Sequence, residues 1–567
     1  MDAVQPHIVD DGKPVAIDLS HHLSSLAKNR VPSPLKGMYK YFVRPGILQL
    51  AGGVPNPAVF PFETITCTSL KSNTFKTAPT PGYVQSLWNW IKGVETDEWV
   101  LEKYDKDKTK FQLSTALQYG TAQGLPGLHQ FIDQFVAHVF DPAYSDFKTV
   151  INAGSTDAWS KIVTTLCEPG DGVLCEEWTY PSALATAWPH GMKPVPLPMD
   201  GGGLTVSGMD QLLGSWDPAQ HDGMRRPRIL YTVPVCQNPT GATMTFERKR
   251  EIYALAVKYD VIIVEDDPYY FLQAGPYSPP SVRAQSDRAK SSRSETDEEF
   301  LKSLVPSYLR CDYQGRVVRI DTFSKTICPG SRLGFTVASP IIAERLEKAN
   351  ESSTQSASGF SQALVGKLLA EQWGLDGYLR WLKGIKAQYR DRRDVMVDLL
   401  VESTDAGLEG RKSSTGDLYE LFARGGRDEK GFSLMKNGEK DPSGKKLLSF
   451  VAPEGGMFIW LRIHFAQHPS YGRLSLSYLL QSLWTDLAEH DVLVAPGSMF
   501  SGRAFPPEVP TDEYTPSDDF SEAAWQASVD EQEGDGFFRI SFSSASREEM
   551  KRATDIVGKR VAKFFSS

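Results

Sequence analysis

Short apolar segments alternate with stretches of helical periodicity between residues 149 and 340. In one such pair, residues 245–259 (TFERKREIYALAVKY) have the spacing of an amphipathic helix, and residues 261–267 (VIIVEDD) are typical of a buried strand. Strands that alternate with helices form a parallel sheet, because each helix returns the chain across one face of the sheet. The sequence therefore predicts an α/β fold with a mostly parallel sheet covered by helices on both faces.

Polar side chains follow the apolar segments at the points where the predicted strands end. They are Ser155, Tyr180, Asn238, Asp266 and Lys325. The carboxyl ends of parallel strands meet at one edge of a sheet, and ligands of such folds bind beyond that edge. We therefore expect these five side chains to lie around one site.

Lys325 lies in the segment RIDTFSKTICPGSRLGF, residues 319–335, just past a predicted strand. Thr322 and Ser324 precede it, and Arg332 follows a Pro-Gly loop. A lysine can form an imine with an aldehyde, and hydroxyls with a guanidinium can hold a phosphate. These groups suit pyridoxal 5′-phosphate, although the segment alone equally fits a strand followed by a surface lysine.

Each of the other candidates also has a purely structural interpretation. Ser155 and Thr156 begin a predicted helix, where they could bind a phosphate or cap the helix. Tyr180 could stack on a flat cofactor or pack in the core, and Asn238 could shape the QNPTG turn. Arg539 interrupts an apolar strand, so it requires either a buried salt bridge or a functional anion.

The composition is that of a globular protein, and it excludes several classes. The 567 residues carry a net charge of −9, which argues against a broad nucleic-acid-binding surface. The six cysteines form no zinc pattern, so no metal is expected. No apolar run is long enough to span a membrane, and the acidic N-terminus has no signal-peptide character. A cytoplasmic protein is the simplest expectation.

The sequence suggests three regions. A proline-rich N-terminal arm covers residues 1–60, and a large domain covers 61–340 with a polar insertion at about 281–299. A smaller α+β domain covers 341–567 and contains a second polar insertion at about 410–446.

Four motifs in order carry a family resemblance. They are QNPTG, VEDDPYYFL, DTFSKTICPGSRLGF and FRISFSSAS. Together they resemble the fold-type-I pyridoxal-phosphate aminotransferases, above all the fungal aromatic-amino-acid aminotransferases and the kynurenine/2-aminoadipate aminotransferases. The resemblance extends from LAGGVPNP, residues 50–57, to the last helix. It implies a large domain with a seven-stranded, mostly parallel sheet between helices, a smaller α+β domain, and pyridoxal 5′-phosphate as the cofactor.

The resemblance also implies roles around the cofactor ring. Lys325 matches the lysine that holds the cofactor and moves the substrate proton. Asp266 matches the carboxylate that pairs with the pyridine nitrogen, and so keeps the ring able to accept electrons. Tyr180 matches the ring that stacks on the cofactor. Asn238 and Tyr269 match the donors to its phenolic oxygen.

Further positions match the phosphate site and the subunit interface of the family. The phosphate residues implied are Ser155, Thr156, Ser324, Arg332 and the neighbouring Thr322. Tyr119 matches a tyrosine that reaches the phosphate from the partner subunit, which implies a homodimer with shared active sites.

On the substrate side, Arg539 matches the arginine that binds the α-carboxylate through two hydrogen bonds. Asn238 and Gly53 match positions beside that carboxylate. Lys36 stands where the kynurenine/2-aminoadipate relatives carry an arginine. A lysine lacks the planar fork of arginine, so the sequence favours aromatic over acidic side chains.

The function expected from the resemblance is ping-pong transamination between an aromatic L-amino acid and a 2-oxo acid, with kynurenine and 2-aminoadipate as further candidate donors. A lyase or decarboxylase could use the same cofactor site, because reaction choice depends on which Cα bond aligns with the ring. A regulatory protein with an aminotransferase-like domain is a third alternative, but no basic recognition helix precedes the shared region. The expected partners are small amino acids and 2-oxo acids, with neither nucleic acid nor membrane.

Overall fold

A computed structural model provides the fold. It describes residues 12–31, 53–75, 95–283, 295–402, 408–413, 418–423, 435–436, 439–440, 444–504, 525–530 and 532–566.

The first of two large sheets is mixed and mostly parallel. Its strands are β3 (Lys148–Asn152), β4 (Gly172–Glu176), β5 (Lys193–Leu197), β8 (Ile229–Thr232), β9 (Ile262–Asp266), β10 (Val317–Thr322) and β11 (Gly334–Ala338). Their order is β3-β11-β10-β9-β8-β4-β5, and only β11 runs antiparallel to its neighbours. The predicted mostly parallel sheet is confirmed.

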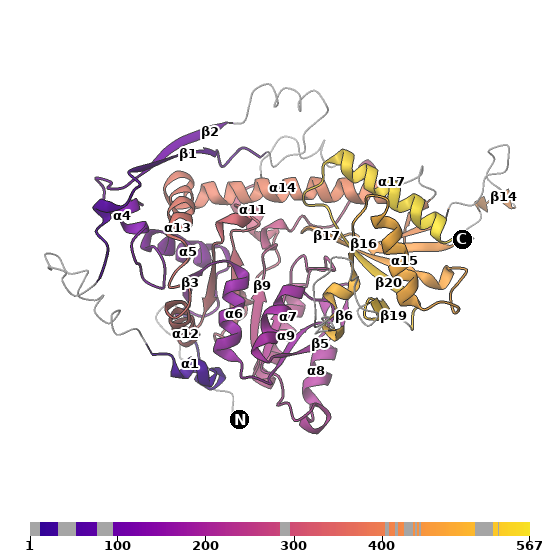
Figure 1. The fold of residues 1–567 in the computed structure, drawn as a ribbon, viewed down its shortest axis with the longest axis horizontal. Helices are drawn as coiled ribbons and strands as arrows, with labels where there is room; N and C mark the ends of the chain where they lie inside the picture. The colour runs from indigo at the N-terminus through magenta and orange to yellow at the C-terminus, as the bar shows by residue number, and fades with distance from the viewer. Residues whose placement is uncertain are drawn as a thin grey trace.

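Helices cover both faces of this sheet (Figure 1). They include α5 (Pro126–Val139), α6 (Ser155–Leu166), α7 (Pro181–Ala187), α8 (Val206–Gly214), α9 (Phe246–Tyr259) and α12 (Pro340–Glu351). Successive residues of one strand enter different cores: Ile263 joins the cluster with α5 and α9, whereas Val264 joins the cluster with α6 and α12. This explains why the strands are apolar throughout rather than alternating.

The second sheet is antiparallel. Its strands are, in spatial order, β12 (Leu408–Lys412), β13 (Leu418–Ala423), β16 (Lys446–Val451), β17 (Phe458–His464), β20 (Asp535–Ser541) and β18 (Ala495–Pro496), with β19 (Val529–Asp530) also pairing with β20. Helices α15 (Leu476–Ala488) and α17 (Arg547–Phe564) lie beside it, and α14 (Gly374–Val401) runs from the first sheet to the second (Figure 1). Helix α14 follows α13 (Gly359–Gly366) and the π-helical segment Lys367–Trp373.

Two segments differ from their interpretation as polar insertions. Strand β13 lies within 410–446, and β12 overlaps its start. Tyr419 and Leu421 of β13 are buried in the core of the second sheet. Helix α11 (Asp297–Lys302) likewise begins inside 281–299. Charged, Gly and Ser residues flank both elements in the sequence, so the segments have the composition of a surface insertion. In β13, moreover, only Tyr419 and Leu421 are deeply buried.

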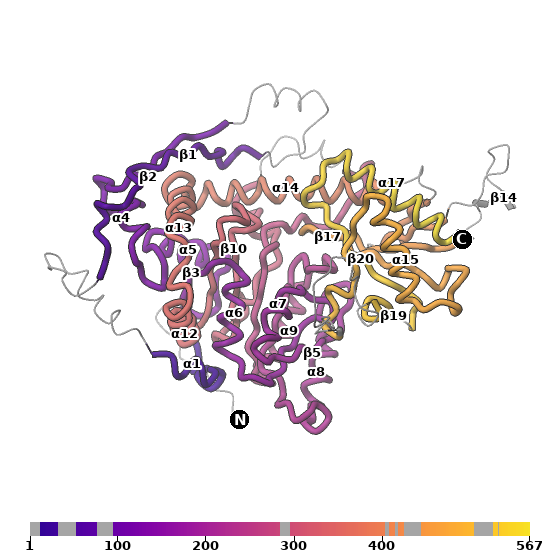
Figure 2. Tube along the Cα trace, in the orientation of Figure 1, coloured from indigo at the N-terminus to yellow at the C-terminus, as the bar shows by residue number. Residues whose placement is uncertain are grey.

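The remaining elements are short. They are α1 (Ser25–Asn29), the hairpin β1 (Thr64–Leu70) and β2 (Thr96–Glu102), α4 (Leu113–Ala116), and the strand pairs β6 (Met199–Asp200) with β7 (Gly203–Leu204) and β14 (Met435–Lys436) with β15 (Glu439–Lys440). The tube in Figure 2 shows α1 beside α6 and α12, so part of the predicted arm packs on the first sheet's helices. None of the described helices combines the length and apolar character that a membrane crossing requires.

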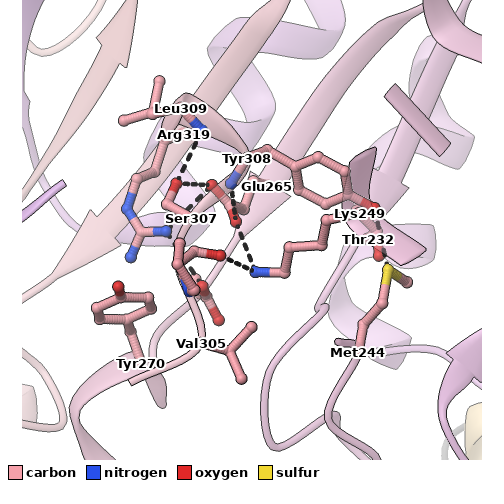
Figure 3. Close-up of polar contacts among 12 residues, drawn as sticks. Thr232, Met244, Lys249, Glu265, Tyr270, Val305, Ser307, Tyr308, Leu309 and Arg319 are labelled. Carbon is pink, nitrogen blue, oxygen red and sulfur yellow. Dashed lines mark hydrogen bonds and ion pairs between the residues drawn. The ribbon is translucent and has the colours of Figure 1, made fainter. Parts of the chain in front are cut away.

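A buried ion network joins β9, β10 and α9 (Figure 3). Arg319 Nη1 lies 3.1 Å from Glu265 Oε2 and 3.1 Å from Asp267 Oδ2, and Arg319 Nη2 lies 3.0 Å from Asp321 Oδ2. Lys249 Nζ lies 3.3 Å from Glu265 Oε1. All of these side chains except Asp321 are fully buried. Two cations therefore lie against three carboxylates away from water.

Figure 3 also shows how Glu265 is satisfied on its other side: Ser307 donates to its carboxylate, and the Tyr308 amide donates to Oε1 at 3.0 Å. The Arg319 guanidinium further lies 4.0 Å from the ring centre of Phe140 and 4.7 Å from that of Tyr270. Glu265 and Arg319 therefore each have several partners, as buried charges require, whereas Asp267 Oδ1 and Arg319 Nε are buried without a hydrogen-bond partner among the described residues.

We predict that Arg319→Met lowers the free energy of unfolding by about 3–5 kcal/mol, because it leaves three buried carboxylates with one cation. Chemical denaturation measures the change. Lys302→Met removes the surface pair with Glu298 (2.6 Å) and serves as the control, with an unchanged unfolding midpoint. Equal midpoints for the two variants would contradict the prediction.

Candidate active site

The predicted strand-end residues come together at one edge of the first sheet. Ser155 begins α6 after β3, Tyr180 precedes α7 after β4, and Asn238 follows β8. Asp266 ends β9, and Lys325 lies three residues past β10. Because these five strands run in the same direction, the polar residues that follow them share one edge.

Asp266 is a buried carboxylate with one oxygen satisfied. The Tyr231 hydroxyl donates to Oδ2 at 2.7 Å, whereas Oδ1 is buried without a hydrogen-bond partner among the described residues. Burial raises the pKa of Asp266 to about 6, and the hydroxyls of Tyr231 and the nearby Ser155 act in the opposite direction. A cationic N–H at Oδ1 would satisfy this oxygen and favour the ionised carboxylate.

The N-terminus of α6 is open to an anion. Gly154 precedes the helix with φ +96°, and a Cβ built there would lie 2.3 Å from Arg332 Nη2. The Ser155 hydroxyl is buried without a partner among the described residues, and Thr156 is exposed. Free backbone N–H groups and the helix dipole at this end suit a phosphate.

Hydroxyls and a guanidinium connect the end of β10 to this helix. Thr322 Oγ1 donates to Ser324 Oγ at 2.9 Å, and Arg332 Nη1 donates to Ser324 Oγ at 3.1 Å. Arg332 Nη2 donates to the Ala153 carbonyl at 3.1 Å, just before α6. The structure thus places the predicted phosphate residues in one continuous cradle.

Lys325 is half-buried beside this cradle. Its Nζ lies 6.0 Å from the centre of the Tyr269 ring. Burial lowers the pKa of Lys325, and the nearby Arg332 and Arg539 lower it further. A lysine with a lowered pKa offers more of the neutral amine, which is the form that acts as nucleophile or base.

Arg539 brings the second sheet into the site. It lies on β20, and its Nη1 donates to Asn238 Oδ1 at 2.8 Å. The guanidinium carbon lies 4.3 Å from the ring centre of Phe458 and 4.6 Å from that of Phe500. Arg539 has no carboxylate partner among the described residues, so the buried salt bridge that was the structural alternative for this residue is absent there.

The two tyrosines predicted at the cofactor ring occupy different environments. Tyr269 is buried, packs edge-to-face on Phe458 at 5.7 Å, and has its pKa raised by burial. Tyr180 is half-buried at the start of α7.

Two predicted residues lie outside this cluster, and a third is not among the described residues. Gly53 is exposed, and a Cβ there would meet no described atom within 4 Å. Tyr119, just after α4, is 61% exposed. Lys36 lies outside the described residues.

The structure adds residues that the sequence analysis did not identify. Tyr231, Phe458 and Phe500 contact Asp266 or Arg539 directly, yet each lies in or near an apolar segment in which an aromatic residue is typical of the core. Gly154 was detectable in principle, because a glycine before a Ser-Thr helix start is typical of close backbone approach to a phosphate.

The chain is similar to known aminotransferases. The family model of aminotransferase class I and II matches residues 95–416. An aromatic amino acid aminotransferase of Schizosaccharomyces pombe is 32% identical over 486 residues, which is 85% of this chain and 90% of that protein. An L-tyrosine:2-oxoglutarate aminotransferase of Serpula lacrymans is 32% identical over 505 residues, 87% of this chain and 85% of that protein.

The fold has a solved counterpart. The crystal structure of the aminotransferase Aro8 from Candida albicans superimposes with a TM-score of 0.76 at 32% identity, covering 98% of this chain and 100% of that one. The family model spans more than half of the sequence, and the relatives cover most of it. The chain belongs to the aminotransferase class I and II family.

Proposed function

We propose that this protein transfers the amino group of an aromatic L-amino acid to a 2-oxo acid by a ping-pong mechanism. The observation that carries the proposal is the juxtaposition of a half-buried lysine of lowered pKa, a buried carboxylate with one unsatisfied oxygen, and a phosphate-type cradle. The names of the relatives, aromatic amino acid and L-tyrosine:2-oxoglutarate aminotransferase, support the substrate class and favour transamination over a lyase reaction.

The cofactor is pyridoxal 5′-phosphate, which when bound supplies an aldehyde that exchanges amines and a ring that accepts electrons. The residues fit this group. Asp266 Oδ1 and Ser155 Oγ are both buried without partners among the described residues, and a ring N–H and a phosphate oxygen are the complementary groups. Tyr180 would lie on the ring, and Asn238 and Tyr269 would donate to its phenolic oxygen.

The phosphate would lie between β10 and α6. The residues proposed to hold it are Ser155, Thr156, Ser324 and Arg332, with Thr322 orienting Ser324. Because Arg332 is already hydrogen-bonded to the Ala153 carbonyl, its guanidinium is fixed against the helix end before any anion binds.

Lys325 is the proposed proton carrier. Its neutral amine would take the proton from Cα of the amino acid and deliver it to C4′ of the cofactor, and the second half-reaction would run these transfers in reverse. The lowered pKa of Lys325 increases the fraction of neutral amine near neutral pH. Arg539 binds the substrate carboxylate, and Asn238 holds the guanidinium in place.

The proposal extends to substrate range and assembly. Lys36 and Gly53 would border the substrate, with kynurenine and 2-aminoadipate as further donors. Tyr119, which is largely exposed, would reach the phosphate of a second copy in a homodimer. We further propose a cytoplasmic protein whose large domain (61–340) binds the cofactor and whose small domain (341–567) supplies Arg539.

We predict that Lys325→Ala loses at least about 100-fold in turnover, since general base catalysis is removed, and loses the visible absorbance of the covalently held cofactor. Formation of the aromatic 2-oxo acid and an absorbance scan are the measurements. Lys348→Ala, which removes a surface pair with Glu344, is the control and retains both. An intact band together with turnover in Lys325→Ala would contradict the assignment.

Gly154→Ala should weaken cofactor binding about tenfold or more, because a Cβ would displace the Arg332 guanidinium and strain a backbone with φ +96°. Titration of the apoenzyme with pyridoxal 5′-phosphate gives the dissociation constant. Gly201→Ala is the matched control, since nothing lies within 4 Å of a Cβ there. Equal affinities in both variants would argue against the cradle.

The dimer is tested by sedimentation equilibrium of the holoenzyme. We expect a mass of about twice the chain's 62.9 kDa, as for the isologous dimers that dominate soluble oligomers. A fully active species with the mass of one chain would rule out shared sites.

A further inference from the structure

Two buried phenyl rings contact the guanidinium of Arg539. We propose that Phe458 and Phe500 are positioning residues that hold this guanidinium in the orientation that binds the substrate carboxylate. The inference rests on the proposed role of Arg539 and adds the elements that orient it.

The rings come from separate segments beside β20. Phe458 begins β17, which pairs with β20, and Phe500 ends the 3-10 helix Gly497–Phe500 that follows β18 on the other side of β20. Their centres lie 4.3 Å and 4.6 Å from the guanidinium carbon, and both side chains are buried. At such distances the rings attract the cation in place of the water it has lost.

The hydrogen-bond donors of Arg539 show why orientation matters. Nη1 is engaged by Asn238, and Nε is buried with no partner among the described residues. The Nε edge is therefore available to a carboxylate. A two-point contact with a planar carboxylate requires a fixed guanidinium plane, and a single bond to Asn238 leaves rotation about that bond unrestrained. The two rings supply that restraint.

Each ring is also anchored on the cofactor side of the site. Phe458 packs edge-to-face against Tyr269 at 5.7 Å. The Phe500 carbonyl accepts a hydrogen bond from the Thr179 amide at 2.8 Å, one residue before Tyr180. The rings thus couple the position of Arg539, on the second sheet, to two residues that border the cofactor on the first.

Neighbouring aromatic residues do not share this arrangement. Trp460 and Phe537 stack on each other at 5.5 Å with nearly parallel rings, and Trp178 packs against both. Trp460 also packs edge-to-face on Phe500 at 5.9 Å. Among the described rings, the Arg539 guanidinium contacts Phe458 and Phe500, so the proposal concerns these two residues.

A double-mutant cycle on the holoenzyme tests the proposal. The probe is 3-phenylpropanoate, which has the carboxylate and ring of an aromatic substrate but no amine to react. Its dissociation constant is measured from the change in cofactor absorbance. We expect Phe458→Leu and Phe500→Leu each to raise it about tenfold. Combined with Arg539→Met, neither should raise it further, because the group that the rings orient is then absent.

The control and the contrary outcomes are distinct. Phe465→Leu truncates a buried ring that stacks on Phe565 in the hydrophobic core of the second sheet, and it should leave probe affinity unchanged. The positioning role would be overturned if the leucine substitutions reduced probe affinity equally in the presence of Arg539 and in the Arg539→Met background. It would also be overturned if neither leucine variant lost affinity while Arg539→Met did. Unchanged affinity in Arg539→Met alone would overturn the carboxylate site and this inference with it. If a leucine variant fails to retain cofactor, the corresponding methionine variant fills the volume without a ring, and the same outcomes apply.

Discussion

The ion network centred on Arg319 supports the part of the sheet on which the site is built. Because successive strand residues point to opposite faces, Glu265 and Asp267 turn toward Arg319 while Asp266, between them, turns toward the site. Asp321, the third carboxylate, directly precedes Thr322 of the cradle. The network therefore ties together the strand ends that carry Asp266 and Lys325.

Two sheets contribute side chains to one site. The first sheet supplies the lysine, the carboxylate and the helix end, whereas Arg539 comes from the second sheet and reaches Asn238 across the junction. The loop before Tyr180 is bonded to the segment around Phe500 through the Thr179 amide and through Gly502 N to the Glu177 carbonyl at 2.8 Å. The proposed carboxylate site at Arg539 is thus linked, through these backbone hydrogen bonds, to the residues proposed to border the cofactor.

The sequence predicted what depends on periodicity and on motif order. The strand–helix alternation indicated the parallel sheet, and the strand ends indicated Ser155, Asp266 and Lys325. Partners buried within apolar segments could not be predicted, because Tyr231 and Phe458 have the same local pattern as core residues. Strand β13 was missed because segments rich in charge, Gly and Ser flank it on both sides, although the strand itself (LYELFA) contains one charged residue and buries Tyr419. Contacts between distant segments, such as Phe500 with Arg539, have no local signal.

The proposed reaction depends on Lys325, which we propose holds the cofactor and moves the substrate proton. Borohydride reduction of the holoenzyme, followed by proteolysis and mass spectrometry, tests it most directly, because reduction fixes the cofactor to whichever lysine carries it. We expect a phosphopyridoxyl group on the peptide that contains Lys325. The group on any other lysine, or on none in enzyme that turns over aromatic amino acids, would contradict it.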